Sequence, residues 1–111
     1  MSTTGRYHAR IMDAQSVDET LSTVLGPSIL SQVQEGVFYT IFGPNTTAGV
    51  VTIEGAHATD YTGTWSNIAT ITWATTDTVH RTNYTGAHLA IRARISTVIS
   101  GGTVSVEFLG N

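Results

Sequence analysis

Apolar and polar residues alternate most clearly in the last third of the chain. In residues 88–96 one side carries His88, Arg92 and Arg94, and the other side is wholly apolar. The apolar residues are Leu89, Ile91, Ala93 and Ile95. This period of two is typical of a strand with one buried and one wet face. Residues 103–109 alternate in the same way and predict another strand.

Similar short runs, separated by Gly, Pro, Asn and Asp, occur from residue 37 onward. We predict strands in residues 37–42, 49–54, 67–73, 88–96 and 103–109. The turn residues 43–47 predict a hairpin between the first two strands, and Ser100-Gly101-Gly102 predicts one between the last two. The second hairpin would place Glu107 opposite Arg92 or Arg94.

The first third of the chain is less regular. Residues 17–25 and 28–33 fit either two strands broken at Gly26-Pro27 or a short helix ending there, and their β-branched residues favour strands. Residues 1–12 indicate an extended arm, so we divide the chain into an arm (1–16) and one sandwich domain (17–111). Seven or eight short strands predict an all-β fold, an antiparallel β-sandwich of jelly-roll or Greek-key type with an extended N-terminal arm.

Composition narrows the choice of partners. Only 12% of the 111 residues are charged, there is no lysine, and the net charge is -3. A nucleic-acid binder needs clustered basic side chains, so we expect no nucleic-acid partner. We also expect a soluble chain with neither a signal peptide nor a membrane span. A surface rich in Thr, Ser, Gly and Ala is weakly solubilised and indicates a protein covered by partners.

Motifs for catalysis or metal binding are missing from the sequence. There is no Cys, no Gly-x-Ser-x-Gly and no P-loop. Glu54, His57 and Asp60 have the spacing of metal ligands on a helix, but here they straddle a strand end and a loop. We therefore expect neither a metal site nor a cofactor, and a protein that is not an enzyme.

Aromatic residues suggest two roles for one loop. Trp65 and Tyr61 either cap the end of the sandwich or form an exposed platform on which a sugar stacks. Trp73 shares its side of the strand with Ile71 and belongs to the expected core. Arg92 and Arg94 form a basic stripe that Glu107 and Glu54 are expected to neutralise.

Several stretches together resemble small structural proteins of tailed bacteriophages. They are Phe42-Gly43, residues 49–55, Gly63-Thr64-Trp65, Ile68-Ala69-Thr70, residues 84–93 and residues 101–106. The resemblance covers residues 37–111 and is one of strands and turns. It implies a β-sandwich decoration (cement) protein of the phage head or a small tail, baseplate or fibre module. These families bind through surfaces, so no functional residue is carried over from them.

We therefore expect a virion structural protein, assembled in the host cytoplasm, that stabilises the head. Its expected partners are the lattice of the major capsid protein and copies of itself, with no membrane partner. The residues expected to make these contacts are Tyr7, Ile11, Met12, Tyr61 and Trp65. The alternative is a tail, baseplate or fibre module that binds a host glycan or an adaptor protein.

Overall fold

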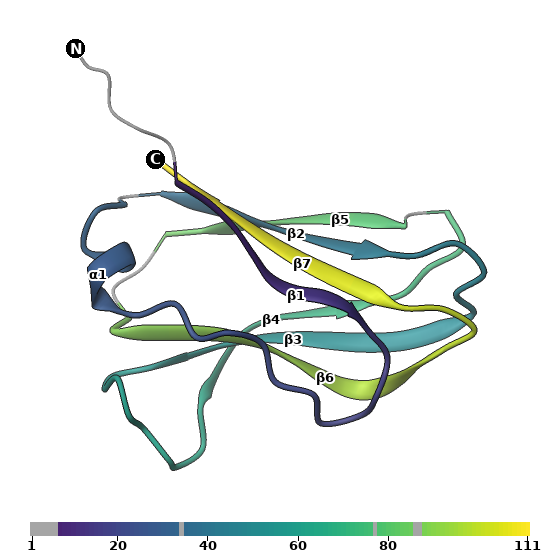
Figure 1. Cartoon of the computed structure of the whole chain (residues 1–111), viewed down its shortest axis with the longest axis horizontal. Coiled ribbons are helices and arrows are strands. Elements are labelled where there is room, and N and C mark those ends of the chain that lie inside the picture. Colours follow the sequence, from purple (N-terminus) through teal and green to yellow (C-terminus); the bar gives the residue numbers. More distant parts are fainter. Residues whose placement is uncertain (1–6, 34, 77, 86–87) are drawn as a thin grey trace.

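Two antiparallel sheets pack face to face in a sandwich (Figure 1). The computed structural model describes residues 7–33, 35–76, 78–85 and 88–111. Sheet A has the order β1 (Tyr7–Gln15), β7 (Val104–Gly110), β2 (Gly36–Phe42) and β5 (Val79–Tyr84). Sheet B has the order β4 (Ser66–Thr72), β3 (Ala48–Ala56) and β6 (Ala90–Ser100). The predicted all-β sandwich is confirmed.

An irregular segment, residues 16–25, extends sheet B beyond β6. The backbone amide of Glu19 donates to Ile95, and Leu25 and Ile91 exchange two hydrogen bonds of 2.8 and 3.0 Å. If this segment is counted as a strand, the strands pair from the two ends of the chain inward. β1 pairs with β7, the segment with β6, β2 with β5 and β3 with β4. A long hairpin rolled up in this way is a jelly roll.

The core fills the space between the two sheets. Phe38 of β2 and Phe108 of β7 lie with their ring centres 4.8 Å apart, and both are fully buried. Sheet B contributes a row of fully buried aliphatic side chains, namely Val51, Ile53, Ile91 and Ile95. These residues alternate with outward-facing ones, as the period of two requires.

The expected N-terminal arm needs correction, because Tyr7–Gln15 form β1 and pair with β7 along sheet A. A register shift between Arg10 and Met12 allows two consecutive residues, Ile11 and Met12, to be buried. The domain therefore includes at least residues 7–15, and a boundary at residue 16 would cut through the sandwich. Residues 1–6 lie outside the described part of the chain.

Both predicted hairpins were wrong. Residues 43–47 and 101–103 carry the chain from one sheet to the other, because β2 and β7 belong to sheet A while β3 and β6 belong to sheet B. Glu107 consequently does not face Arg92 or Arg94. These two connections lie against each other, with Gly43 donating to Thr103 (2.7 Å) and Thr47 donating to Ser100 (2.8 Å).

Residues 28–33 do not form the expected strand. Pro27–Leu30 form a short helix, α1, with proline in its first turn, where its missing N–H costs nothing. β5 was absent from the prediction, because its inward residues His80 and Thr82 are polar and the strand shows no apolar side.

Candidate functional site

The structure separates the five residues predicted to contact partners into two groups. Ile11 and Met12 are 4% and 3% exposed and belong to the main core. Tyr7, at the start of β1, is half-buried and packs against Phe108 with ring centres 6.3 Å apart. The β1 residues therefore stabilise the sandwich, and a partner could reach Ile11 and Met12 only if β1 left the sheet.

Tyr61 and Trp65 lie together in the loop between β3 and β4. Their ring centres are 6.5 Å apart, and Trp65 donates its indole N–H to the Tyr61 carbonyl at 3.2 Å. Trp65 is 8% exposed and packs with Ala56 and Ala90 in a small second core. Trp65 therefore caps one end of sheet B, and it does not offer a free face on which a sugar can stack.

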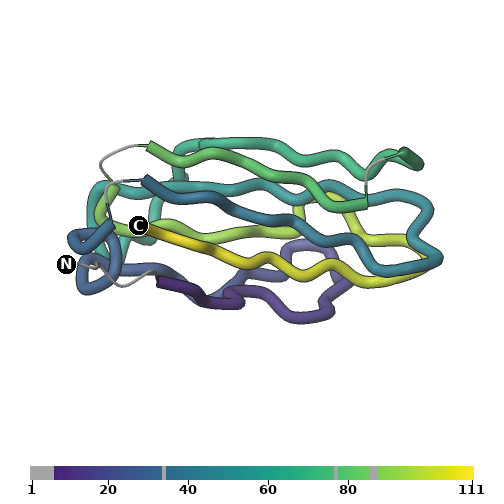
Figure 2. Tube along the Cα trace, turned by 90° about the horizontal axis from the view of Figure 1, so that it is seen from above, coloured from purple at the N-terminus to yellow at the C-terminus, as the bar shows by residue number. Residues whose placement is uncertain are grey.

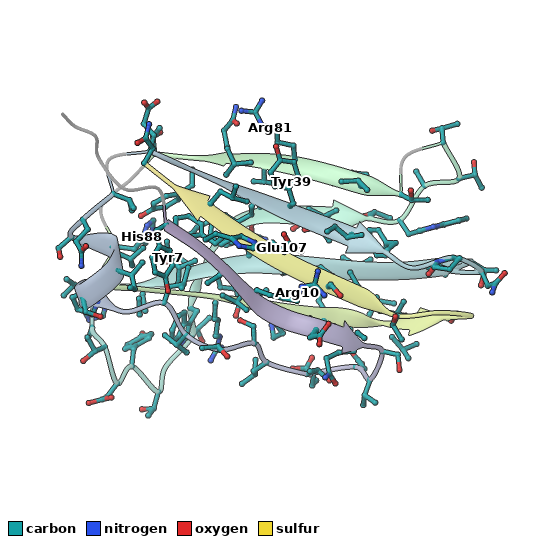
Figure 3. All side chains as sticks on the ribbon, turned by 45° about the horizontal axis from the view of Figure 1, so that its top comes forward. Tyr7, Arg10, Tyr39, Arg81, His88 and Glu107 are labelled. Carbon is teal, nitrogen blue, oxygen red and sulfur yellow. The ribbon has the colours of Figure 1, made fainter. Side chains whose placement is uncertain are left out.

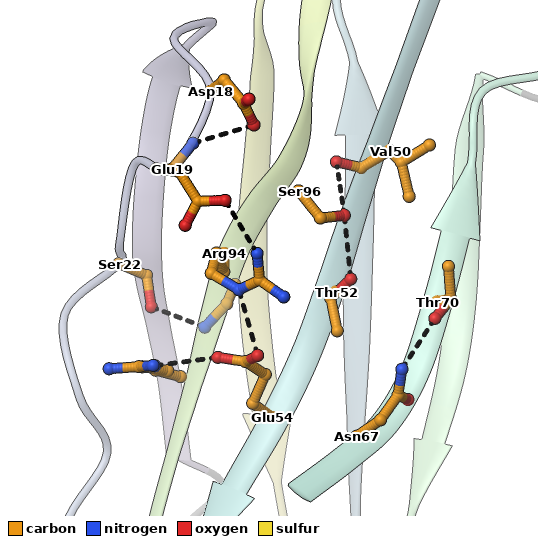
Figure 4. A network of polar contacts seen from close by, with 12 residues as sticks. Asp18, Glu19, Ser22, Val50, Thr52, Glu54, Asn67, Thr70, Arg94 and Ser96 are labelled. Atoms are coloured by element: carbon orange, nitrogen blue, oxygen red, sulfur yellow. Dashed lines mark hydrogen bonds and ion pairs between the residues drawn. The ribbon is translucent and has the colours of Figure 1, made fainter. Parts of the chain in front are cut away.

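The outward face of sheet B carries a closed polar network (Figure 4). The Glu54 carboxylate, 7% exposed, accepts hydrogen bonds from Nε of Arg92 (2.9 Å) and Nε of Arg94 (3.0 Å). Arg94 also contacts Glu19 at 3.1 Å, which ties residues 16–25 to β6. Because the charges of this network neutralise one another, it holds the sheet together and presents little net charge to a partner.

The outward face of sheet A differs, because an apolar strip runs along its middle. The strip, hereafter the sheet A face, consists of Val37, Tyr39, Ile41, Val79 and Leu109. The register places Tyr39 between Glu107 on β7 and Arg81 on β5. Figure 3 shows Arg10, Glu107, Tyr39 and Arg81 following one another across the four strands. An apolar centre beside charged groups is the usual make-up of a protein interface.

A cluster of charged residues borders the sheet A face on the β1 side. Glu107 accepts hydrogen bonds from Arg10 Nη2 (2.6 Å) and from His8 Nε2 (3.1 Å), and Arg10 also contacts Asp13 at 3.0 Å. The hydrogen bonds from Arg10, followed by that from His8, lower the pKa of Glu107. Glu107 thus stays ionised and fixes the positions of the two side chains at this border.

A shallow hollow of about 510 Å³ lies at one end of the same face. Tyr39 and Tyr84 contribute aromatic surface to it, and Glu35, Arg81 and Asn83 contribute polar groups. The backbones of Glu35 and Asn111 are hydrogen-bonded at its end (3.0 Å). An aromatic ring with a few polar groups around it is the composition of a site for a small polar ligand.

A second, smaller hollow of about 170 Å³ is lined by His57, His88 and Tyr61. His88 Nδ1 lies 3.2 Å from the Tyr84 hydroxyl, and burial raises the pKa of Tyr84.

Within the described ranges, no cluster of three or more His, Asp or Glu side chains is arranged to hold a metal ion. No helix in that part of the chain is long and apolar enough to cross a membrane.

The residues of the sheet A face were missed from the sequence for an identifiable reason. Residues 37–42 are apolar or aromatic at almost every position, so the alternation does not reveal which side faces solvent. Arg81 and Val79 lie on β5, which was not recognised as a strand. The outward side of β2 can be identified once β2 is known to pair between β7 and β5, whose outward residues include Glu107 and Arg81. This strand pairing is a property of the fold.

Comparison with known proteins finds no family that matches this chain, and no curated protein or solved structure that resembles it.

Proposed function

We propose that the chain is a non-catalytic structural protein of a virus particle, a decoration protein that binds the major capsid protein lattice of a tailed-phage head. The phage-like strands and turns of residues 37–111 motivate this role. The jelly-roll order supports it, since this fold recurs among viral capsid proteins. The flat shape, with extents of 42 × 35 × 18 Å, suits a tile lying on a surface.

The sheet A face carries the proposal. Val79 is 51% exposed, and the outward side chains of β2 beside it are apolar or aromatic. Burying this face against a capsid lattice removes apolar surface from water, which stabilises the complex by about 25 cal/mol per Å² before the costs of association. The charge of Glu107 beside this face is compensated by its ion pair with Arg10.

A matched pair of variants tests this role. Val79 and Val98 are exposed to similar extents, 51% and 47%, but they belong to different sheets. We expect Val79→Asp to lower the number of copies retained on purified particles at least about tenfold, whereas Val98→Asp leaves it unchanged. Quantitative gels and mass spectrometry of the particles should find hundreds of copies of the parent chain. Equal retention of both variants, or absence of the chain from particles, would refute the proposal.

The hollow beside Tyr39 favours one alternative, a tail, baseplate or fibre module that binds a host glycan. Its aromatic and amide groups suit a sugar, which would stack on Tyr39 and accept hydrogen bonds from Arg81 and Asn83. In that case three, six or twelve copies would be found per particle. Arg81→Ala would then abolish glycan-array binding, and Trp65→Ala would leave it intact in the folded protein.

A further inference from the structure

β4 forms an open edge of sheet B. Among the residues that the structure describes it pairs only with β3, and the amide of Trp73 donates to Gly49 at 3.0 Å at the end of that ladder. In an antiparallel ladder, alternate residues direct both backbone groups to the neighbour and the residues between direct them away. Counting back from Trp73, the N–H and C=O groups of Thr72 and Thr70 point outward from the edge, and an irregularity in the ladder opposite Ile53 and Glu54 interrupts the alternation at Ile68.

No charge protects this edge. Residues 61–76 contain no Asp, Glu, Lys, Arg or His, and β4 itself is Ser-Asn-Ile-Ala-Thr-Ile-Thr. Open edges in soluble proteins are usually guarded by charged residues or by a covering segment. The other edges here follow that rule, since β5 carries Arg81, β1 carries Arg10 and Asp13, and residues 16–25 cover β6.

We propose that β4 pairs antiparallel with β4 of a second copy of this chain, around a two-fold axis at Thr70. Thr70 then lies opposite Thr70 of the second copy, and Ile68 lies opposite Thr72. The outward backbone groups of Thr70 and its copy form about two hydrogen bonds across the axis, and the two three-stranded sheets become one continuous sheet. The dimer is independent of the virion role, because it uses a different sheet from the sheet A face.

A second copy is the partner that fits this strand best. Self-pairing around a two-fold axis places the side chain at the axis opposite its own copy, so a charge there would face a like charge. β4 escapes this penalty because it has no charge. β4 and β5 run along the same side of the molecule (Figure 2), but self-pairing of β5 around Arg81 would oppose two guanidinium groups. Sheet B is therefore the sheet that continues into the second copy.

Sedimentation equilibrium of the full chain tests the dimer. We expect the parent chain to reach twice its mass of 11.8 kDa as its concentration rises to about 1 mM. Thr70→Pro removes an outward N–H without breaking a bond to β3, and the loss of two hydrogen bonds across the axis should weaken the dimer roughly 30-fold. A parent chain that remains monomeric at that concentration would overturn the proposal.

Val79→Pro is the matched control. Phe42 donates to the Thr78 carbonyl (2.8 Å), so the next residue, Val79, directs its own N–H away from β2 at the edge of sheet A. This variant should dimerise as the parent chain does. If Thr70→Pro dimerised as strongly as Val79→Pro, the interface would lie elsewhere and the proposal would fail.

A charge swap keeps the test decisive if Thr70→Pro does not fold. Thr70→Lys and Thr70→Glu retain the backbone N–H, and each alone opposes like charges across the axis and should dimerise several-fold more weakly. Mixed together, they should form a heterodimer, visible by native mass spectrometry, at least as tightly as the parent dimer. Absence of this rescue would overturn the two-fold register. Concentration-dependent protection of the Thr70 amide, in hydrogen exchange of the parent chain, would support it.

Discussion

The guanidinium of Arg92 lies 4.1 Å from the centre of the Trp65 ring. The same side chain donates its Nε–H to Glu54 on β3, so one residue of β6 holds both the neighbouring strand and the β3–β4 loop. A planar guanidinium can stack on a ring and donate a hydrogen bond in its own plane at the same time. The end of sheet B therefore depends on an arginine at this position.

Replacing this arginine by lysine should destabilise the fold although the charge is kept. Arg92→Lys loses the planar stacking and the Nε–H bond, which we expect to lower the free energy of unfolding by about 1 kcal/mol. Urea unfolding followed by tryptophan fluorescence measures this change. Arg81→Lys, on the exposed edge strand β5, is the control and should shift stability by less than about 0.5 kcal/mol. Equal effects in the two variants would rule out the stacking role.

Removing the charge of Glu54 should cost much more than removing that of Glu107. Glu54→Gln leaves Arg92 and Arg94 without their buried carboxylate, and we expect a loss of about 2 kcal/mol, reduced by the partial exposure of both arginines. Glu107→Gln changes a cluster whose partners are about half exposed, and it should cost less than about 1 kcal/mol. Chemical denaturation at pH 7 ranks the two variants, and the reverse order would contradict the network described for sheet B.

Acid should remove the contribution of Glu107. Its pKa is lowered in the folded protein by the hydrogen bonds from Arg10 and His8, whereas an unfolded glutamate titrates near about 4.3. The stabilisation is therefore fully present above about pH 4.3 and is lost as pH falls through the lower folded pKa. The stability difference between the parent chain and Glu107→Gln should be constant from pH 7 to about pH 5 and shrink below about pH 4. A difference that grows on acidification would contradict this sign.

Gly101 should be hard to replace because its backbone has a φ of +83° and the connection 43–47 lies against it. A Cβ at this position would meet the carbonyl oxygen of Asn45, which is backbone and cannot turn away. Gly101→Ala should cost about 2 kcal/mol or more. Gly26→Ala is the control, because a Cβ there meets nothing within 4 Å, and its stability should change little. Thermal unfolding of both variants decides the comparison.

Much of the fold could be predicted because most strands bury one apolar side. The alternation in residues 88–96 and 103–109 located β6 and β7 to within a few residues. The order of the strands could not be predicted, since Ser100-Gly101-Gly102 serves equally for a hairpin and for a crossing between sheets. That crossing explains why Glu107 pairs with Arg10 and not with Arg94.

The candidate site was predicted less well than the fold. Ile11, Met12 and Trp65 were chosen as large apolar residues outside the recognised strands, and such residues are more often buried than exposed. The sheet A face was missed because its apolar residues differ from core residues only in the side of the strand on which they lie. Val37 and Tyr39 face outward only because Phe38 and Thr40 face inward, and both sets look alike in the sequence.

The rolled hairpin also determines when the protein can fold. Tyr7 pairs with Gly110, more than 100 residues later, and among the described strands β7 is the only neighbour of β1 within the sheet. During synthesis β1 therefore waits without a partner until β7 has emerged from the ribosome, whereas β3 and β4 can pair as soon as both exist. Such long-range pairing slows folding to about milliseconds to seconds, and the larger sheet is completed last.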